Sequence, residues 1–401
     1  MRKYLTFNIQ KYTTMNQIKI GIVGLGVMGT EHINSLKKTD LVRLTAVCDI
    51  KKDLADLRAK ENNVNAYYSA DDLINSGDVD AVLVATPHYS HTPITVNALE
   101  AGLHVLCEKP VAVHKADAEK MIAAHKKNPK LKFAVMFQVR TDSIFKKIKS
   151  MIDNGELGKI YRINWLITNW FRTQTYYNSG SWRATWEGEG GGVLLNQAPH
   201  QLDLFQWMFG MPKKIRAYCS LGKFHDIEVE DDVTAYCEFE DGFSGMFITS
   251  TGEAPGTNRL EISADRGRLV LENGKIMFDR AETSVSEFLK TTTASFDTPK
   301  MELVEIKTDG SGGNHIDIIE NFANAIINGD DLIAPGEEAI NSLELANSFL
   351  YSSLKDETVE LPLDSQKFAA LLNDLISNST YEKPEEVKPT DNINSSYNKP
   401  K

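Results

Sequence analysis

The stretch Ile18-Lys19-Ile20-Gly21-Ile22-Val23-Gly24-Leu25-Gly26-Val27-Met28-Gly29 decides the fold of the first part of the chain. Its first half is a short apolar, β-branched run of the kind that forms a buried parallel strand. The second half is a GxGxxG motif, and residues 30–38 continue from it with a helical pattern. We expect Gly24 to make a tight turn, Gly26 to admit a pyrophosphate, and Gly29 to let helix and strand pack closely.

A second strand and an acidic residue complete this pattern. Residues 41–48 are predicted to form a strand that ends at Asp49, about 20 residues beyond the glycines. The start of the intervening helix offers N–H groups to phosphates, and Asp49 suits the two hydroxyls of an adenosine ribose. Because Asp49 repels a 2′-phosphate, the sequence predicts NAD; Lys51 and Lys52 nearby leave NADP as the alternative. The predicted cofactor-binding residues here are Gly24, Leu25, Gly26, Val27, Met28, Gly29 and Asp49.

The rest of the chain indicates two domains that differ in the order of their predicted helices and strands. Strands predicted at 80–85, 102–107 and 132–137 alternate with helices at 93–101 and 115–127, which favours a parallel sheet. Beyond the helix at 144–154, strand follows strand without helices between them, at 159–168, 214–220, 232–239, 243–251, 258–264 and 267–271. Helices return at 315–328, 337–355 and 366–377. We therefore predict an α/β Rossmann domain with a parallel sheet, plus an α+β domain with a large, mostly antiparallel open sheet.

Composition sets limits on location and partners. The chain has 401 residues and a net charge of −11, without a long basic block, which argues against a nucleic-acid or anionic-membrane surface. No apolar run approaches the roughly 18 residues that a membrane span needs. The four cysteines lie far apart, which suits a reducing, cytoplasmic compartment and gives no support for a metal site.

The expected domain organisation has four parts. They are an N-terminal extension (1–15), an NAD(P)-binding Rossmann domain (16–140), a substrate and oligomerisation domain (141–378) and a disordered tail (379–401). The tail is polar and contains prolines, so we expect its removal to be harmless. An open sheet with an exposed apolar face favours a partner, here a homodimer or homotetramer.

A second informative stretch runs from Gly188 to Asp203, with the sequence GEGGGVLLNQAPHQLD. Its glycines let backbone approach a ligand, and a helix is predicted to begin near Asn196, with Pro199 in the first turn. Asn196, His200 and Asp203 then project from one face, with His200 one turn into the helix. Asn196 serves either as a substrate contact or as the helix N-cap. Asp203 either orients the surroundings of His200 or lies in a buried polar network.

The glycine motif, the run Cys107-Glu108-Lys109-Pro110 and the pattern GGGxLLNxxxHxxD together resemble the Gfo/Idh/MocA oxidoreductases. The resemblance covers residues 16–378. It implies hydride transfer between NAD(P) and a carbinol of a sugar, polyol or derivative. It also implies catalytic roles for Lys109 and His200, and cofactor contacts from Thr86, Pro87, His91, Glu108, Lys109, Trp182, Arg183 and Tyr351.

One residue departs from the family pattern. Many dehydrogenases of the family carry aspartate where this chain has Asn196, which cannot ionise. The change puts a two-residue acid–base mechanism in doubt, but not the fold or the cofactor. We expect His200, with a pKa near 6.5, to take the hydroxyl proton while Lys109 polarises the oxygen. The residues expected to line the substrate are Lys109, Arg140, Tyr176, Tyr177, Trp182, Arg183, Asn196 and His200.

Three functions fit these features. The first is an NAD(P)-dependent oxidoreductase acting on a secondary alcohol or ketone of a small carbohydrate, cyclitol or glycoside. The second is an NAD-dependent glycosidase that oxidises a sugar carbon transiently and then eliminates the glycosidic bond. The third is a non-catalytic NAD-binding sensor, which would need neither Lys109 nor His200.

Overall fold

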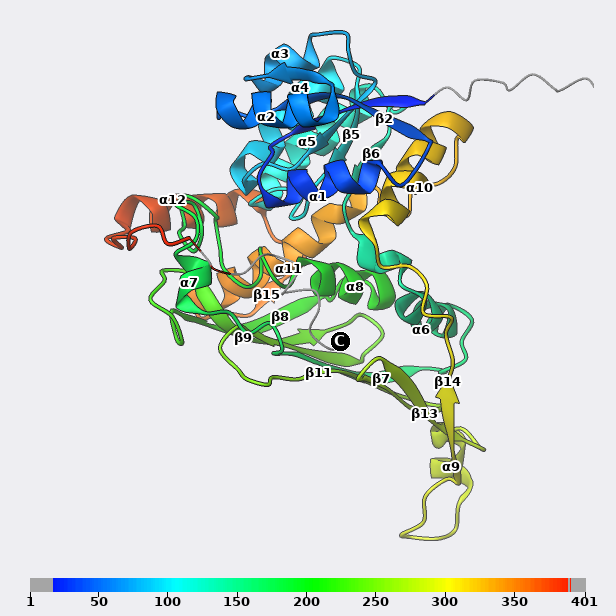
Figure 1. Cartoon of the computed structure of the whole chain (residues 1–401). Helices are drawn as coiled ribbons and strands as arrows, with labels where there is room; N and C mark the ends of the chain where they lie inside the picture. The colour runs from blue at the N-terminus through cyan, green and yellow to red at the C-terminus, as the bar shows by residue number, and fades with distance from the viewer. Residues whose placement is uncertain (1–16, 389, 391–401) are drawn as a thin grey trace, which may run out of the picture.

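A computed structural model describes residues 17–388 and residue 390; the expected extension 1–15 and the end of the tail lie outside them. The first domain is a parallel sheet of six strands in the order β3-β2-β1-β4-β5-β6 (Figure 1). These strands are β1 (Ile18–Val23), β2 (Val42–Cys48), β3 (Asn65–Tyr67), β4 (Ala81–Val84), β5 (His104–Cys107) and β6 (Phe133–Val135). The order is that of a dinucleotide-binding sheet, so the Rossmann prediction is confirmed. Of the strands in this sheet, the short, polar β3 was not predicted, nor were the helices on either side of it in the chain, residues 52–62 and 70–74.

Helices connect these strands. They are α1 (Val27–Leu36), α2 (Lys52–Asn62), α3 (Ala70–Ile74), the 3₁₀ turn η1 (His88–Ser90), α4 (His91–Glu100), α5 (Lys115–Lys127) and the 3₁₀ turn η2 (Gln138–Thr141). In β1 five of the six residues are buried, and β4 is buried throughout. Burial of successive residues means that both faces of the sheet are covered, which explains the continuous apolar runs in the sequence.

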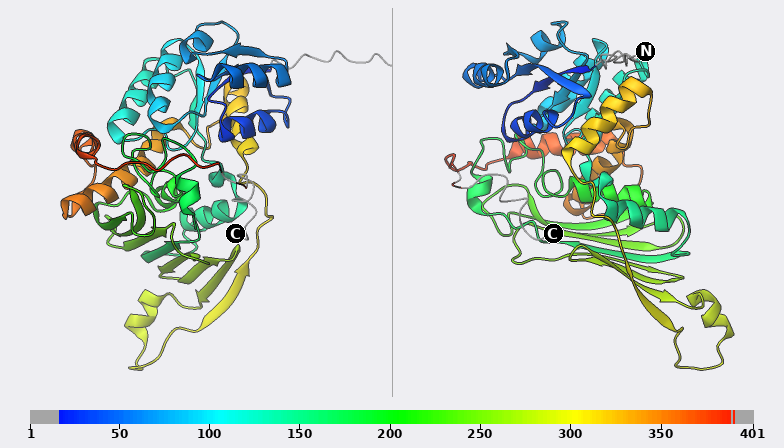
Figure 2. Two further views of the ribbon diagram at one scale, coloured as in Figure 1. Left: turned by 60° about the vertical axis from the view of Figure 1, so that its left-hand side comes forward. Right: turned by 45° about the vertical axis from the view of Figure 1, so that its right-hand side comes forward.

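The second domain is built on a sheet of nine strands in the order β14-β13-β12-β11-β7-β10-β9-β8-β15. They are β7 (Ile160–Ile167), β8 (Lys214–Leu221), β9 (Glu230–Glu238), β10 (Ser244–Ser250), β11 (Asn258–Ala264), β12 (Gly267–Glu272), β13 (Lys275–Ala281), β14 (Met301–Ile306) and β15 (Val359–Glu360). All neighbours are antiparallel except β7 and β10. The predicted mostly antiparallel sheet is thus confirmed. Figure 2 shows the end formed by β13 and β14 extending away from the body.

The helices of this part of the chain are α6 (Ser143–Asp153), α7 (Gln174–Tyr177), α8 (Pro199–Phe209), α9 (Val285–Thr291), α10 (His315–Asn328), α11 (Gly336–Lys355) and α12 (Ser365–Asn378). Helices α8 and α11 pack together on one face of the sheet, α10 lies against α1, α12 against α5, and α9 lies at the outer end beside β13 and β14 (Figure 1). Phe247 of β10 lies at the centre of the packing, with ring centroids 5.8 Å from Phe205 of α8 and 5.7 Å from Phe349 of α11. All three rings are fully buried, so α8 is anchored by aromatic packing on the sheet.

Helix α11 also joins the two domains. The backbone N–H of Lys115 donates to Asn347 (2.9 Å), and its ammonium group lies 2.7 Å from Glu344 and donates to the carbonyl of Leu363 (2.9 Å). Lys115 and Glu344 are both buried, so this ion pair is well shielded from solvent. The second domain is therefore fixed against the first beside the carboxyl ends of the parallel strands.

The segment after α12 differs from expectation. Residues 379–388 lie against the loop that follows β7, and the N–H of Val387 donates to the carbonyl of Asn178 (3.0 Å). The prediction that the tail has no fixed contacts is wrong for these residues. Their polar, proline-containing composition hid the contacts, because most of these bonds end on backbone carbonyls, which no sequence pattern marks. Among the described residues, no helix combines the length and apolarity needed to span a bilayer.

Candidate active site

The three motif glycines occupy different environments at the start of α1. Gly24 has φ +93°, and a Cβ there would lie 2.6 Å from the carbonyl oxygen of Ala85. A Cβ on Gly29 would lie 1.9 Å from the carbonyl oxygen of Gly24, so this position needs glycine for helix–strand packing. Gly26, by contrast, is exposed and has no atom within 4 Å of such a Cβ. The open space above Gly26 therefore fits a ligand, as expected for a dinucleotide phosphate at a helix N-terminus.

Asp49 lies beside this space at the end of β2. Its carboxylate accepts hydrogen bonds from the backbone N–H groups of Leu25 and Lys51, both at 2.9 Å. These bonds hold the side chain at the edge of the glycine loop, where a ribose would follow the pyrophosphate. The first residues of α1 fit the same ligand: Val27 is 55% exposed, and the helix start has no capping side chain.

His91 has a different role from the one expected. Its two ring nitrogens lie 2.9 Å from the carbonyl of Thr86 and 2.8 Å from that of Pro110, and the ring is fully buried. His91 thus ties the loop after β4 to the loop after β5, and both of its ring nitrogens are used within the protein. The Thr86 hydroxyl is buried without a hydrogen-bond partner among the described residues, so a cofactor contact from Thr86 and Pro87 stays a prediction.

Glu108 is held from inside the protein. One carboxylate oxygen lies 2.6 Å from Nε2 of His32, and the other accepts from the N–H of Lys109 (3.0 Å). Burial alone would raise the pKa of Glu108, but the hydrogen bond and charge of His32 outweigh it, and the pKa falls to about 2. His315, at the start of α10, stacks edge-on against His32. Sequence reasoning missed both histidines, and Glu108 is more deeply paired than a simple ribose ligand.

Lys109 reaches from the first domain into the second. Its ammonium group donates to the backbone carbonyl of Asn196 (2.7 Å). The amide of Asn196 in turn donates to Glu189, and its side-chain oxygen accepts from the hydroxyl of Tyr176 (3.1 Å). Burial lowers the pKa of Lys109, while the carboxylates of Glu108 and Glu189 oppose that shift. The result is one polar cluster assembled from both domains.

Glu189 is the member of this cluster that the sequence did not single out. It is 1% exposed, and its second oxygen accepts from the N–H of Ala184 (2.6 Å). Burial raises its pKa, and the charge of Arg183 opposes that shift. A lone acidic residue inside a glycine run was the available signal, because burying a carboxylate among glycines requires specific partners.

A second buried carboxylate, Glu230 of β9, shapes the glycine run. One oxygen accepts from the N–H groups of Gly192 (2.8 Å) and Leu194 (3.0 Å). Burial raises the pKa of Glu230 to about 7. A Cβ on Gly192 would lie 1.9 Å from the Glu230 carbonyl oxygen, so the close approach requires glycine. These contacts hold the run as a loop.

Helix α8 consequently begins later than expected. It starts at Pro199 with Ala198 as N-cap, so Asn196 precedes the helix and is not its cap. Pro199 does occupy the first turn, as predicted. His200 is the second helical residue and does not lie one turn in.

The ring of His200 lies next to Phe137 and Gln138 of the first domain. The centroid of Phe137 is 5.9 Å away, and Nε2 of His200 lies 3.4 Å from the Gln138 amide nitrogen. Nδ1 is buried without a hydrogen-bond partner among the described residues. Burial, followed by the charge of Lys109, lowers the pKa of His200 to about 3. The expected pKa near 6.5 is therefore too high, because the ring is enclosed by its neighbours and the charge of Lys109 opposes its protonation.

Arg140 lies outside the site. Its guanidinium makes two 2.7 Å bonds to Asp203 and one to Glu338, and it is 1% exposed. The expectation that Arg140 binds substrate is wrong, because its donors are used in this network. Asp203 therefore belongs to a buried polar network, the second of its two expected roles.

The aromatic residues of the loop before the glycine run fall into two groups, one beside the polar cluster and one in the core. The hydroxyl of Tyr176 accepts from Arg183 (2.9 Å), whose guanidinium lies 4.6 Å from the ring centroids of both Tyr176 and Trp182. Trp182 stacks edge-on with His88 of the first domain at 5.3 Å. Tyr177 is 2% exposed and bonds Thr251, so its expected substrate contact is wrong.

Tyr351 is not brought to this cluster by any bond of the described residues. It is half-buried on α11, where the adjacent residues Ser352 and Ser353 bond the backbone of β8. Its expected contact with the cofactor stays a prediction.

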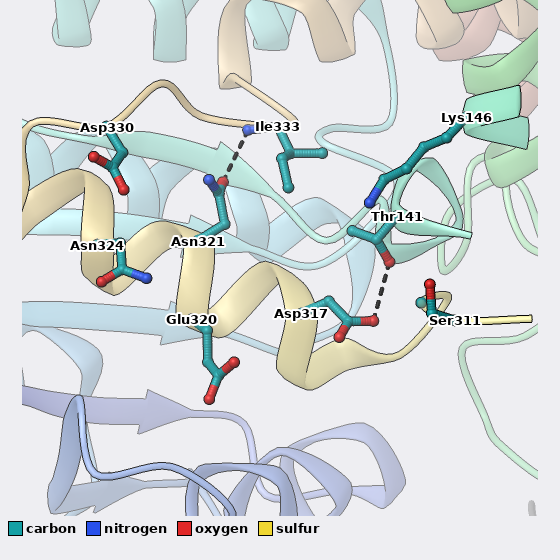
Figure 3. A pocket seen from close by; sticks show the side chains of 10 residues that line it. Thr141, Lys146, Ser311, Asp317, Glu320, Asn321, Asn324, Asp330 and Ile333 are labelled. Carbon is teal, nitrogen blue, oxygen red and sulfur yellow. Dashed lines mark hydrogen bonds between the residues drawn. The ribbon is translucent and has the colours of Figure 1, made fainter. Parts of the chain in front are cut away.

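A hollow of about 390 Å³ lies elsewhere, between α10 and η2 (Figure 3). Thr141 donates to Asp317 (3.1 Å), and Asn321 accepts from the N–H of Ile333 (2.8 Å). Lys109 and His200 do not line this hollow. Within residues 17–388, no group of histidine, cysteine, aspartate or glutamate side chains has the arrangement of a metal site.

Known proteins share both domains. Residues 18–137 match the model of the oxidoreductase family with an NAD-binding Rossmann fold, and residues 145–270 match the GFO/IDH/MocA C-terminal domain. The chain is 29% identical to myo-inositol 2-dehydrogenase of Thermotoga maritima over 267 residues, which cover 64% of this chain and 75% of that protein. It is also 29% identical to the rhizopine catabolism protein MocA of Rhizobium meliloti over 245 residues, covering 60% and 74% of the two chains.

A solved structure agrees with both matches. The WlbA dehydrogenase of Chromobacterium violaceum, in complex with NADH and UDP-GlcNAcA, gives a TM-score of 0.76 at 27% identity over 90% of this chain and 100% of that one. The first domain is thus an NAD-binding Rossmann domain, in keeping with the open space above Gly26. The chain belongs to the Gfo/Idh/MocA family of oxidoreductases.

Proposed function

We propose that the protein is an NAD(P)-dependent dehydrogenase or reductase acting on a secondary alcohol or ketone of a sugar, cyclitol or glycoside. The carrying observation is that the ammonium group of Lys109, from the first domain, bonds the carbonyl of Asn196, four residues before His200. This bond brings the ammonium group of Lys109 to the segment that leads into His200, which supports a shared site for two groups able to handle a hydroxyl proton. The names of the relatives, inositol and sugar-nucleotide dehydrogenases, support the substrate class.

The chemistry divides between cofactor and chain. When bound, the nicotinamide accepts or gives the hydride. Nδ1 of His200 is buried, so Nε2 is the nitrogen that a substrate hydroxyl reaches. With a pKa of about 3, the imidazole is neutral across the working pH range and accepts the hydroxyl proton at Nε2. Lys109 donates to the same oxygen and stabilises the charge that develops there.

Polar groups around Lys109 fit a polyhydroxylated substrate. Asn196, Tyr176 and Arg183 offer both donors and acceptors, and Trp182 offers an aromatic face to sugar C–H groups. Asn196 does not ionise, so the proton is held by His200 alone. Glu189 lies behind Asn196 and keeps its amide oriented.

The decisive experiment is a substrate panel. Purified protein is incubated with NAD or NADH and with sugars, inositols, keto-sugars and aryl glycosides, and NADH absorbance is followed. Formation or consumption of NADH supports the dehydrogenase. Aryl-glycoside cleavage with bound NAD and without NADH release would favour the redox-assisted glycosidase. NAD binding without any turnover, unchanged by substitution of Lys109 or His200, would favour the sensor.

The first expected outcome concerns cofactor choice. Asp49→Ala should weaken NAD binding about tenfold or more, because a hydrogen-bonded charged acceptor is lost, and should narrow the preference over NADP. Fluorescence titration with NADH and NADPH measures both affinities. Asp53→Ala removes an equal charge from the nearby start of α2 and should leave the ratio unchanged. An unchanged ratio in Asp49→Ala would refute the role given to Asp49.

Assembly and location are further proposals. The outer face of the nine-stranded sheet exposes Tyr218 (63%) and Tyr236 (41%), and Leu166, Met246 and Ile248 line a shallow hollow there. We propose a homodimer or homotetramer that covers this face, which light scattering tests by mass. All four cysteines are unpaired, which supports a reducing compartment such as the cytoplasm.

A further inference from the structure

Residues 379–388, here called the strap, lie along the segment that carries the proposed substrate contacts. That segment, residues 174–189, is called the substrate loop. In Figure 1 the strap is the red segment beyond α12, on the same side of the molecule as α7. Besides Val387, Tyr381 bonds the carbonyl of Asp226 (2.7 Å), and Ser379 bonds Glu228. The strap is therefore tied both to the substrate loop and to the loop before β9.

Lys383 makes the central contact of the strap. Its ammonium group donates to the carbonyl of Tyr177 at the end of α7 (2.9 Å) and to the carbonyl of Arg183. One cation thus bridges two backbone groups six residues apart. The side chain is half-buried, so these charge-assisted bonds are partly shielded from water.

The same peptide unit is held from the other side. The carbonyl of Arg183 accepts from Lys383, and the N–H of the next residue, Ala184, donates to buried Glu189. The carbonyl and the N–H belong to one peptide unit, so a cation holds one edge of this unit and a carboxylate holds the opposite edge. Glu189 also bonds Asn196, so the peptide is connected to the carbonyl that receives Lys109.

The backbone at this point is strained. Ala184 has φ +57°, a left-handed conformation that L-residues other than glycine rarely adopt. Such a conformation persists only where the surroundings hold it from several sides, and it commonly occurs at functional sites. Here the turn directs Arg183 onto Tyr176 and Trp182.

We propose that Lys383 is a positioning residue for substrate binding. By holding the Arg183–Ala184 peptide in its strained turn, it keeps Arg183 and Tyr176 in place for a polyhydroxylated substrate. The role in substrate binding rests on the proposed function, but the ordering of the loop does not. A tail segment that the composition marks as dispensable thus becomes part of the site.

The first test measures loop order directly. Hydrogen exchange with mass spectrometry is run on the full-length protein, on Lys383→Met, and on Lys388→Met as a matched control, since Lys388 is an exposed lysine in the same strap. Lys383→Met should speed exchange of amides in residues 178–189 by about tenfold or more and leave the first domain unchanged. Unchanged exchange in 178–189 overturns the proposal, whatever the enzyme's substrate.

The second test uses the substrate found with the panel. Lys383→Met should raise the substrate KM about tenfold, with a smaller change in kcat and unchanged NADH affinity, and Lys383→Arg should recover part of the loss. Removal of residues 381–401 should act like Lys383→Met. Faster exchange with an unchanged KM would refute the substrate role. If no substrate turns over, the proposed function fails, and the exchange result still decides whether Lys383 orders the loop.

Discussion

His200→Ala is expected to lower kcat about 10²–10⁴-fold while leaving NADH affinity nearly unchanged. The imidazole is the neutral group placed to take the hydroxyl proton, and the methyl group of alanine cannot replace it. Asp49 and the glycine loop belong to the opposite end of the expected dinucleotide, so cofactor binding does not depend on His200. Steady-state kinetics with the substrate found in the panel give kcat, and fluorescence titration with NADH gives the cofactor affinity.

The pH dependence distinguishes His200 from an ordinary histidine. Because burial and Lys109 lower its pKa to about 3, acidification from pH 8 to pH 5 does not protonate it in the free enzyme. The kcat/KM of the wild type should therefore show no loss with a midpoint near pH 6.5. A loss with that midpoint, present in the wild type and absent in His200→Gln, would contradict the low pKa of His200. The melting temperature of His200→Gln serves as the control for folding. If the kcat of His200→Ala lies within about threefold of the wild-type value, His200 has no part in the mechanism.

Arg140→Met is expected to destabilise the fold by about 3–5 kcal/mol, because it leaves Asp203 buried without its charge partner. Burial already raises the pKa of Asp203, and the charge of Arg140 opposes that rise. Without the guanidinium, folding must either keep an unpaired charge or protonate the carboxyl. Urea unfolding at pH 7 measures the loss as a lower midpoint.

A double variant distinguishes the loss of the Arg140–Asp203 ion pair from the cost of leaving one unpaired charge buried. Arg140→Met combined with Asp203→Leu removes both charges and should recover much of the stability, since a well-packed apolar pair often replaces a buried ion pair. If Arg140→Met raises the substrate KM without lowering the unfolding midpoint, Arg140 is a substrate ligand, as expected from the sequence. A structural role of Arg140 thus predicts a lower unfolding midpoint, and a substrate-binding role predicts a higher KM.

Local signals carried much of the fold and the centre of the site. The strand, glycine loop and Asp49 lie within some 30 residues and interact with one another, so their spacing alone predicts them. The positions of Lys109 and His200 follow from short motifs at the end of β5 and the start of α8. The antiparallel sheet follows from strand runs separated by turn residues.

Contacts between segments that lie far apart in the chain could not be predicted from such local signals. The loop before α8 is held by Glu230, which is 38 residues from Gly192 in the chain and accepts from the N–H groups of Gly192 and Leu194. The low pKa of His200 depends on burial under Phe137 and Gln138 of the other domain. The contacts of Lys383 are to backbone carbonyls, which every residue carries, so no pattern of side chains marks them.

Helix α11 has a mechanical consequence for the enzyme. Glu344 and Glu338 of this one helix pair with Lys115 and Arg140 of the first domain, and neither cation is free to swing out into water. A hinge at this joint would have to break both ion pairs at once and expose two buried cations. Lys109 and the segment before His200 are therefore held in register by the same helix that joins the domains, without help from a ligand.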